Sequence, residues 1–137
     1  MHLDGWREVT QVNGQNIAVV LKEGVNQNSS THKLFFINLG GYKPNEFEEF
    51  HYKTIIAATD KSIAILQAKQ TAFYKHTGFE GAPSHVDDKY GIDVDDVYEL
   101  EDILPASIKN KYAIILTPAS AIKEDELHLG YFKLDKL

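Results

Sequence analysis

The densest apolar stretch of the chain is residues 34–39, LFFINL, in which Asn38 is the one polar residue. Apolar side chains at both odd and even positions are typical of a strand that is covered on both faces. The stretch is too short for a convincing helix and is rich in aromatic and branched residues, which favour strands. We therefore expect a central strand here, ended by the pair Gly40–Gly41, with a helix as its lid.

The helical pattern lies at residues 61–76. Thr59 or Asp60 fits the N-cap, and Gly78 fits the C-terminal stop. We expect the apolar stripe of this helix to pack on the sheet. The stripe consists of Ile63, Leu66, Phe73 and Tyr74, with Ala64, Ala68 and Ala72 alongside.

Alternating and branched-rich segments predict further strands. Asn13-Gly14 is a strong two-residue turn signal between residues 6–12 and the return strand 17–21, and a longer turn over residues 13–16 is the alternative. The other predicted strands are residues 51–59, 94–101, 112–117 and 127–134. These elements predict an α+β fold: a mostly antiparallel or mixed sheet with one main helix packed on one face.

Composition narrows the function classes. The 137 residues suit a single domain, and the net charge of −6 disfavours a nucleic-acid partner. The chain contains no cysteine, which excludes disulfides and thiolate metal sites. We expect no membrane association and a cytoplasmic location, because no apolar run approaches the roughly 20 residues of a membrane helix and residues 1–4 lack the layout of a signal peptide.

The chain also contains an internal echo. HLD at residues 2–4 and HVD at residues 85–87 are each followed by a similar strand, AVVL at 18–21 and AIIL at 113–116. If this is a repeat, residues 1–24 are the tail of a first copy and residues 33–137 are a full copy. An incomplete copy leaves apolar surface to be covered by another chain, so we expect a homo-oligomer. Chance similarity between two amphipathic strands is the alternative.

Three segments carry a family resemblance: LFFINLGGYKPNEFEEFH at 34–51, HVDDKYGIDVDDVYELEDIL at 85–104 and HLGYFKL at 128–134. With them the chain resembles an uncharacterised bacterial family, the domain of unknown function 1543. HLDGWREV at 2–9 is similar to the end of the first of two repeats in longer members. The resemblance implies a compact repeat fold without the first Leu-Gly-Gly strand and its helix. It implies no activity, substrate or cofactor.

Two sets of residues are candidates for chemistry. Glu49 and His51 are two residues apart and share a face of a strand, as do His85 and Asp87, and Glu48 lies beside the first pair. Brought together, they could bind a divalent metal or act as a base with an orienting carboxylate. The alternative is that the histidines cap turns while the acids face water. The second candidate is a ligand loop of Gly40, Gly41, Tyr42 and Lys43 that cradles an anion with backbone amides, or else a tight turn.

The acidic run over residues 87–102 lacks the spacing of a calcium loop and is better explained as solvated strand edges.

The first hypothesis is therefore a small binding or interaction module of unknown ligand, without catalysis and self-associating. The alternative is a metal-dependent or acid/base enzyme that uses the His/carboxylate cluster.

Overall fold

A computed structural model describes residues 1–23, 30–42, 47–77 and 93–136. The strands are β1 (His2–Trp6), β2 (Gln11–Val12), β3 (Gln15–Leu21), β4 (Lys33–Tyr42), β5 (Glu49–Ala58), β6 (Asp93–Glu99), β7 (Tyr112–Pro118) and β8 (His128–Lys133). The helices are α1 (Lys61–Thr77), α3 (Ala106–Lys111) and the short 3-10 turns η1 (Leu100–Ile103) and η2 (Leu134–Lys136). The predicted α+β class is confirmed. Within the described residues, no helix is long and apolar enough to cross a membrane.

The strands form three sheets, ordered β5-β4-β6, β2-β3-β7 and β1-β8. Every pairing among the described strands is antiparallel. Sequence patterning located most of these strands to within two residues. It gave no indication that residues 106–111 form α3, or that His2–Trp6 forms a strand that pairs with β8.

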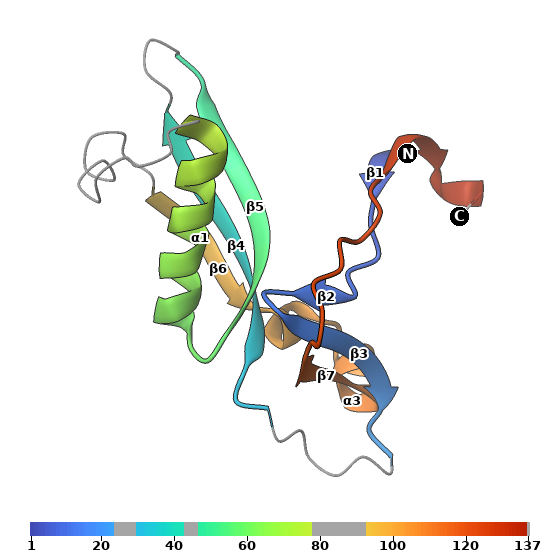
Figure 1. Ribbon diagram of the computed structural model, residues 1–137. Coiled ribbons are helices and arrows are strands. Elements are labelled where there is room, and N and C mark those ends of the chain that lie inside the picture. Colours follow the sequence, from blue (N-terminus) through green and yellow to red (C-terminus); the bar gives the residue numbers. More distant parts are fainter. Residues whose placement is uncertain (24–29, 43–46, 78–92, 137) are drawn as a thin grey trace.

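Strand β4 is the central strand of the largest sheet. It pairs with β5 along its whole length and with β6 on its other edge. Helix α1 lies along one face of this sheet (Figure 1). Phe35, Ile37 and Leu39 are buried in one core cluster with Ala64 and Ala68 of α1, so they point to the face that α1 covers. The prediction of a central aromatic-rich strand under a helix is confirmed.

The face that α1 turns to the sheet matches the predicted one in its alanines but not in its larger side chains. Ala64 and Ala68 are fully buried against β4, and Ile65 packs beside them. Ile63 and Leu66 are exposed, so their assignment to the core was wrong. Small alanines let the helix lie close to the sheet, where the large side chains of β4 fill the space between the two layers. The side chains of Ala72, Phe73 and Tyr74 lie outside the described part of the structure.

The predicted helix start is confirmed. The backbone amide of Ile63 donates a hydrogen bond to Asp60 Oδ1 at 3.0 Å, so Asp60 is the residue that caps α1. The predicted stop, Gly78, is not among the described residues.

The glycine pair does not end β4, and that prediction was wrong. Gly40 pairs with His51 and Gly41 with Phe50, and the strand continues to Tyr42. Glycine is tolerated inside a strand where other groups need to approach the backbone closely. At Gly40 those groups are carboxylates, described below.

The hairpin turn is confirmed as a two-residue turn, which rules out the longer alternative. Asn13 has φ 47° and Gly14 has φ 73°, as a type I′ turn requires at both central positions. The Asn13 side chain also joins two sheets, because its Oδ1 accepts a hydrogen bond from the amide of Ala57 in β5 at 2.9 Å. The strand before the turn is shorter than predicted, since Trp6 belongs to β1.

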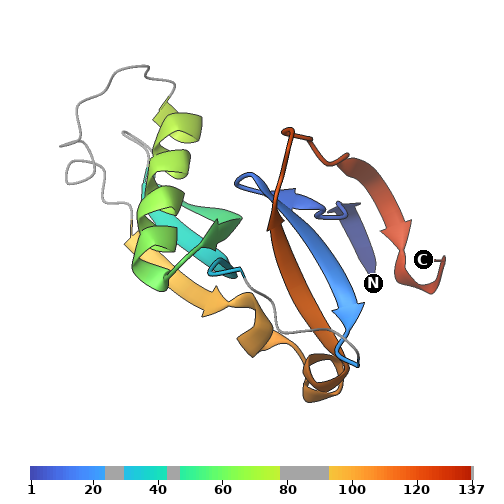
Figure 2. The same cartoon turned by 60° about the horizontal axis from the view of Figure 1, so that its bottom comes forward.

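In the described residues, the second face of the β5-β4-β6 sheet is covered by the β2-β3-β7 sheet at the end near Leu34. There Leu34 and Ala57 are buried with Leu116 of β7, and Ile17 of β3 packs against them. Figure 2 shows the β3 and β7 ribbons on the side of this sheet away from α1. The even-numbered positions of β4 therefore pass from Leu34, under the second sheet, to Gly40, over which the Asp95 and Glu49 carboxylates lie.

The two runs compared in the predicted repeat are neighbours in one sheet, since Ala18 pairs with Ile115 and Val20 with Ala113. Residues 85–87, which carry the second HVD motif, lie outside the described residues. The repeat and its division of the chain at residues 1–24 and 33–137 stay predictions.

The position of β4 generates a stability prediction. Ile37 is 0% exposed and Ile122 is 90% exposed. We expect Ile37→Ala to lower the free energy of unfolding by about 2–5 kcal/mol, because it leaves a cavity between α1 and the sheet. The matched Ile122→Ala change should stay within about 0.5 kcal/mol. Urea unfolding followed by circular dichroism measures both, and similar values for the two variants would contradict the described core.

Candidate functional site

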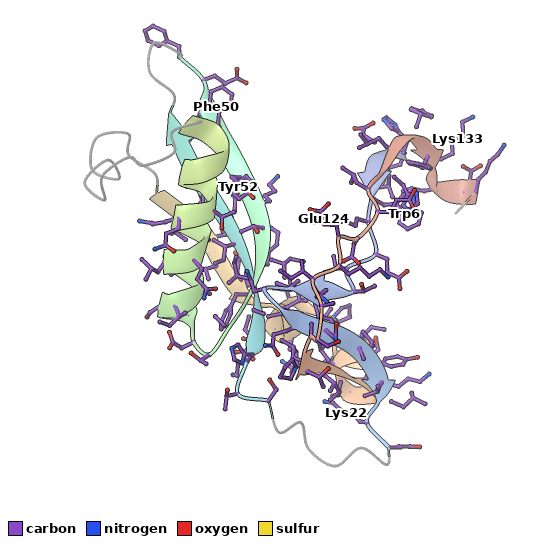
Figure 3. The ribbon with its side chains drawn as sticks, viewed as in Figure 1. Trp6, Lys22, Phe50, Tyr52, Glu124 and Lys133 are labelled. Carbon is purple, nitrogen blue, oxygen red and sulfur yellow. The ribbon has the colours of Figure 1, made fainter. Side chains whose placement is uncertain are left out.

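Strand β5 presents two candidate residues on the face opposite α1. Phe50 and Tyr52 lie on the helix side of this strand in Figure 3, and Tyr52 packs against the core under α1. Successive side chains of a strand alternate between faces. Glu49 and His51 therefore point to the face opposite α1. They lie next to Gly40, which pairs with His51.

Strand β6 adds Asp95 to this face through a β-bulge. The pairing with β4 shifts between Asn38 and Leu39, which face Asp96 and Val94, so that Asp95 is the extra residue. A bulge bends a strand locally and redirects a side chain. Here it brings the Asp95 carboxylate over Gly40.

The three side chains form a compact polar cluster. One ligand atom of each of Glu49, His51 and Asp95 lies within 4.8 Å of the others. His51 Nδ1 lies 2.9 Å from Asp95 Oδ2, and these side chains are 45% and 33% exposed. A Cβ atom added at Gly40 would lie 2.7 Å from Asp95 Oδ2 and 2.9 Å from Glu49 Oε1. Both carboxylates therefore occupy the space that any other residue at position 40 would fill.

Of the remaining predicted site residues, the structure describes the side chain of Glu48 but not those of His85, Asp87, Tyr42 and Lys43. Glu48 precedes β5, is exposed and is not one of the three clustered side chains. His85, Asp87 and Lys43 lie outside the described residues, as does the side chain of Tyr42. The predicted meeting of the pairs Glu49–His51 and His85–Asp87 stays a prediction. The predicted ligand loop is extended strand as far as Tyr42.

Sequence reasoning missed Asp95, which it had placed among solvated acids of a strand edge. The missed signal is the spacing of Val94 and Val97. Both pack against the core under α1, although residues three apart in a regular strand point to opposite faces. Two apolar residues separated by Asp95 and Asp96 thus indicate an inserted residue in β6.

Asp96 is engaged elsewhere on the same face. Its Oδ1 accepts a hydrogen bond from the Tyr98 hydroxyl at 3.0 Å, and its Oδ2 accepts one from Asn38 Nδ2 at 3.4 Å. The hydrogen bond from Tyr98 to the Asp96 carboxylate raises the pKa of Tyr98 above its ordinary value. This network borders the cluster and separates it from the apolar end of the sheet.

A second candidate surface is the two-stranded sheet of β1 and β8, which we call the arm. In the described part of the chain these strands pair only with each other. In Figures 1 and 2 the arm stands on the side of the β2-β3-β7 sheet away from α1. Figure 3 labels Trp6 and Lys133 on it, far from Phe50 and Tyr52 on β5.

Both faces of the arm carry apolar or aromatic side chains. The register places Leu3 opposite Phe132 and Gly5 opposite Leu129 on one face, and Leu129 is 73% exposed. On the other face two ring pairs stack at 4.1 Å, His2 on Tyr131 and Trp6 on His128. Tyr131 is 67% exposed despite this contact.

The base of the arm is held by Asp125, in the segment between β7 and β8. Its carboxylate accepts hydrogen bonds from the amide of Thr10 at 2.8 Å and from the Thr10 hydroxyl, and a longer one from the amide of Gln11. The hydrogen bonds from Thr10 lower the pKa of Asp125 below its ordinary value. The Gln11 side chain adds bonds to Ala121 and Lys123.

The chain matches no protein-family model, and neither a curated protein nor a solved structure shows significant similarity to it. The resemblance to the domain of unknown function 1543 therefore stays a prediction.

Asp125 generates a pH prediction. Its contacts with Thr10 stabilise the folded chain above the ordinary aspartate pKa, and this contribution is lost as pH falls through the lowered pKa of the folded state. Asp125→Asn should reduce stability at neutral pH and should remove this acid-dependent loss. Glu124→Gln, at the exposed neighbouring carboxylate, is the control and should keep the wild-type profile. Thermal melts across the acid range measure the difference, and identical profiles for the two variants would contradict the role of Asp125.

Proposed function

We propose that this chain is a small, non-catalytic interaction module that associates with a second copy of itself through the arm. The observation that supports this most directly is that Leu3 and Leu129 are exposed on the same face of the arm, whose strands pair only with each other in the described residues. Clustered exposed apolar side chains mark interaction surfaces more often than isolated ones do.

The physical argument starts from the size of the arm. A two-stranded ribbon is marginally stable by itself in water, because it buries too little apolar surface to offset the entropy of ordering its residues. In the described residues, each strand of the arm also has one edge without a neighbouring strand. Unpaired edges expose backbone donors and acceptors to any other strand. A partner that pairs with an edge and covers one face removes both deficits.

A second copy of the chain suits this surface better than an unrelated partner. An antiparallel pairing of one arm edge with the same edge of another copy is two-fold symmetric, closes on itself and gives a four-stranded sheet. The Leu3, Leu129 and Phe132 side chains of each copy would then lie on the faces of that sheet, where side chains next to the shared edge contact those of the other copy. The predicted incomplete repeat, which leaves apolar surface to be covered, leads to the same partner.

The alternative, a metal-dependent or acid/base enzyme built on the His/carboxylate cluster, is less well supported. Catalysis by general acids and bases gains from a site that excludes water. The Glu49, His51 and Asp95 side chains are all exposed. We also infer a cytoplasmic module without a nucleic-acid partner, because the net charge is −6 and the chain lacks cysteine.

Self-association predicts a mass of about twice the 15.5 kDa of one chain in size-exclusion chromatography with light scattering. Leu129→Glu should shift the protein to single chains, because it places a charge in the apolar contact. The matched control is Leu66→Glu, at a leucine that is 55% exposed on α1 and distant from the arm. This control should keep the larger mass.

Trp6 provides an independent readout, because it is the only tryptophan in the chain and lies on the arm. On dilution, its emission should shift to longer wavelength as the arm becomes exposed to water, and the Leu129→Glu variant should show the shifted emission at every concentration. A single-chain mass together with concentration-independent emission would refute the proposal. So would loss of the larger mass in the Leu66→Glu control alone.

A further inference from the structure

The end of the β5-β4-β6 sheet near Gly40 carries both imidazole and carboxylate groups, which are metal ligands. We infer that Glu49, His51 and Asp95 bind one divalent transition-metal cation. The site uses no residue of the arm, so it is independent of self-association. It also differs from the cluster predicted from the sequence, since Asp95 of β6 joins Glu49 and His51.

The donor geometry is close to that of a bound cation. Zinc binds imidazole nitrogen and carboxylate oxygen at roughly 2.0–2.2 Å, which places tetrahedral ligands about 3.4 Å apart. The donor atoms of the three side chains lie within 4.8 Å of one another, and His51 Nδ1 and Asp95 Oδ2 are 2.9 Å apart. Rotations of exposed side chains are sufficient to bring all three to ligating distance.

Two backbone features bring the three side chains together: the glycine at position 40 and the bulge in β6. Regular strands pair without a glycine or a bulge. Gly40 lacks the Cβ that would fill the space between the Asp95 and Glu49 carboxylates. The bulge in β6 redirects Asp95 to the face that carries His51. Bulges re-aim side chains at functional sites more often than elsewhere in sheets. Both features act on the same point of the sheet, where the three side chains converge.

The charges of the three groups favour a cation. With a neutral imidazole, two carboxylates give the cluster a local charge of about −2, which a divalent ion neutralises. The contact of His51 Nδ1 with Asp95 Oδ2 holds the cluster only weakly, because contacts between polar side chains that water reaches contribute little to stability. Imidazole nitrogen favours Zn²⁺ over Mg²⁺ and Ca²⁺, which prefer all-oxygen sites. Three protein ligands leave a fourth position for water or for an exogenous anion.

The test is calorimetric titration of the untagged full chain with ZnCl₂, and separately with MgCl₂. We expect saturable binding of one zinc ion per chain at this site and much weaker binding of magnesium. Asp95→Asn and His51→Gln should each weaken zinc binding by at least about tenfold, as expected when a ligand is removed. Gly40→Ala should do the same without removing a ligand, because the new methyl group displaces both carboxylates.

Two matched controls separate this site from other zinc-binding groups. Asp102→Asn removes the partner of Lys109 in an exposed ion pair, and His32→Gln removes a histidine elsewhere on the chain. Both should bind zinc as the wild type does, and circular dichroism should show the same fold in every variant. Absence of saturable binding would overturn the proposal. Wild-type affinity in the Asp95, His51 and Gly40 variants, or an equal loss in the controls, would also overturn it.

Discussion

The structure depends on the burial of β4 on both faces and its pairing on both edges. Ile37 and Leu39 are the largest fully buried side chains of the described residues, and they hold α1 against the sheet. Leu34, on the opposite face, holds the β2-β3-β7 sheet through Leu116. One strand thus supplies residues to both hydrophobic cores, so a change in its register would move apolar side chains to the wrong face of the sheet.

The same strand determines where polar chemistry can lie. In the described residues, its second face is covered by apolar side chains of the second sheet near Leu34 and by carboxylates near Gly40. Glu49, His51 and Asp95 lie together near Gly40. Their side chains stay in contact with water, so their charges do not carry the free-energy cost of burial. Asn38 lies between these two ends of the face, and its side-chain amide donates a hydrogen bond to Asp96. The cluster is therefore a consequence of the glycine at position 40 as well as of the bulge.

The arm differs from β4, because its strands are ordered by pairing but bury little apolar surface. It joins the two ends of the described chain by backbone pairing, yet Leu129 and Tyr131 remain largely in solvent. Asp125 ties its base to Thr10 through backbone and side-chain bonds. In the described residues the arm thus combines a fixed base with exposed apolar side chains, as the proposed self-association requires. Self-association and cation binding would thus occupy separate parts of the molecule.

The sequence by itself determined several elements: the central strand, a turn at Asn13-Gly14, a start of α1 at Thr59 or Asp60 and the α+β class all follow from local patterns. Only the tertiary structure decided that Ala64 and Ala68, rather than Ile63 and Leu66, face the sheet, because that choice depends on how closely two layers pack. It also decided that Gly40 continues β4 and that Asp95 meets His51. Hydrophobic periodicity reports which residues leave water, whereas bulges, strand order and coverage arise from contacts between segments distant in the chain.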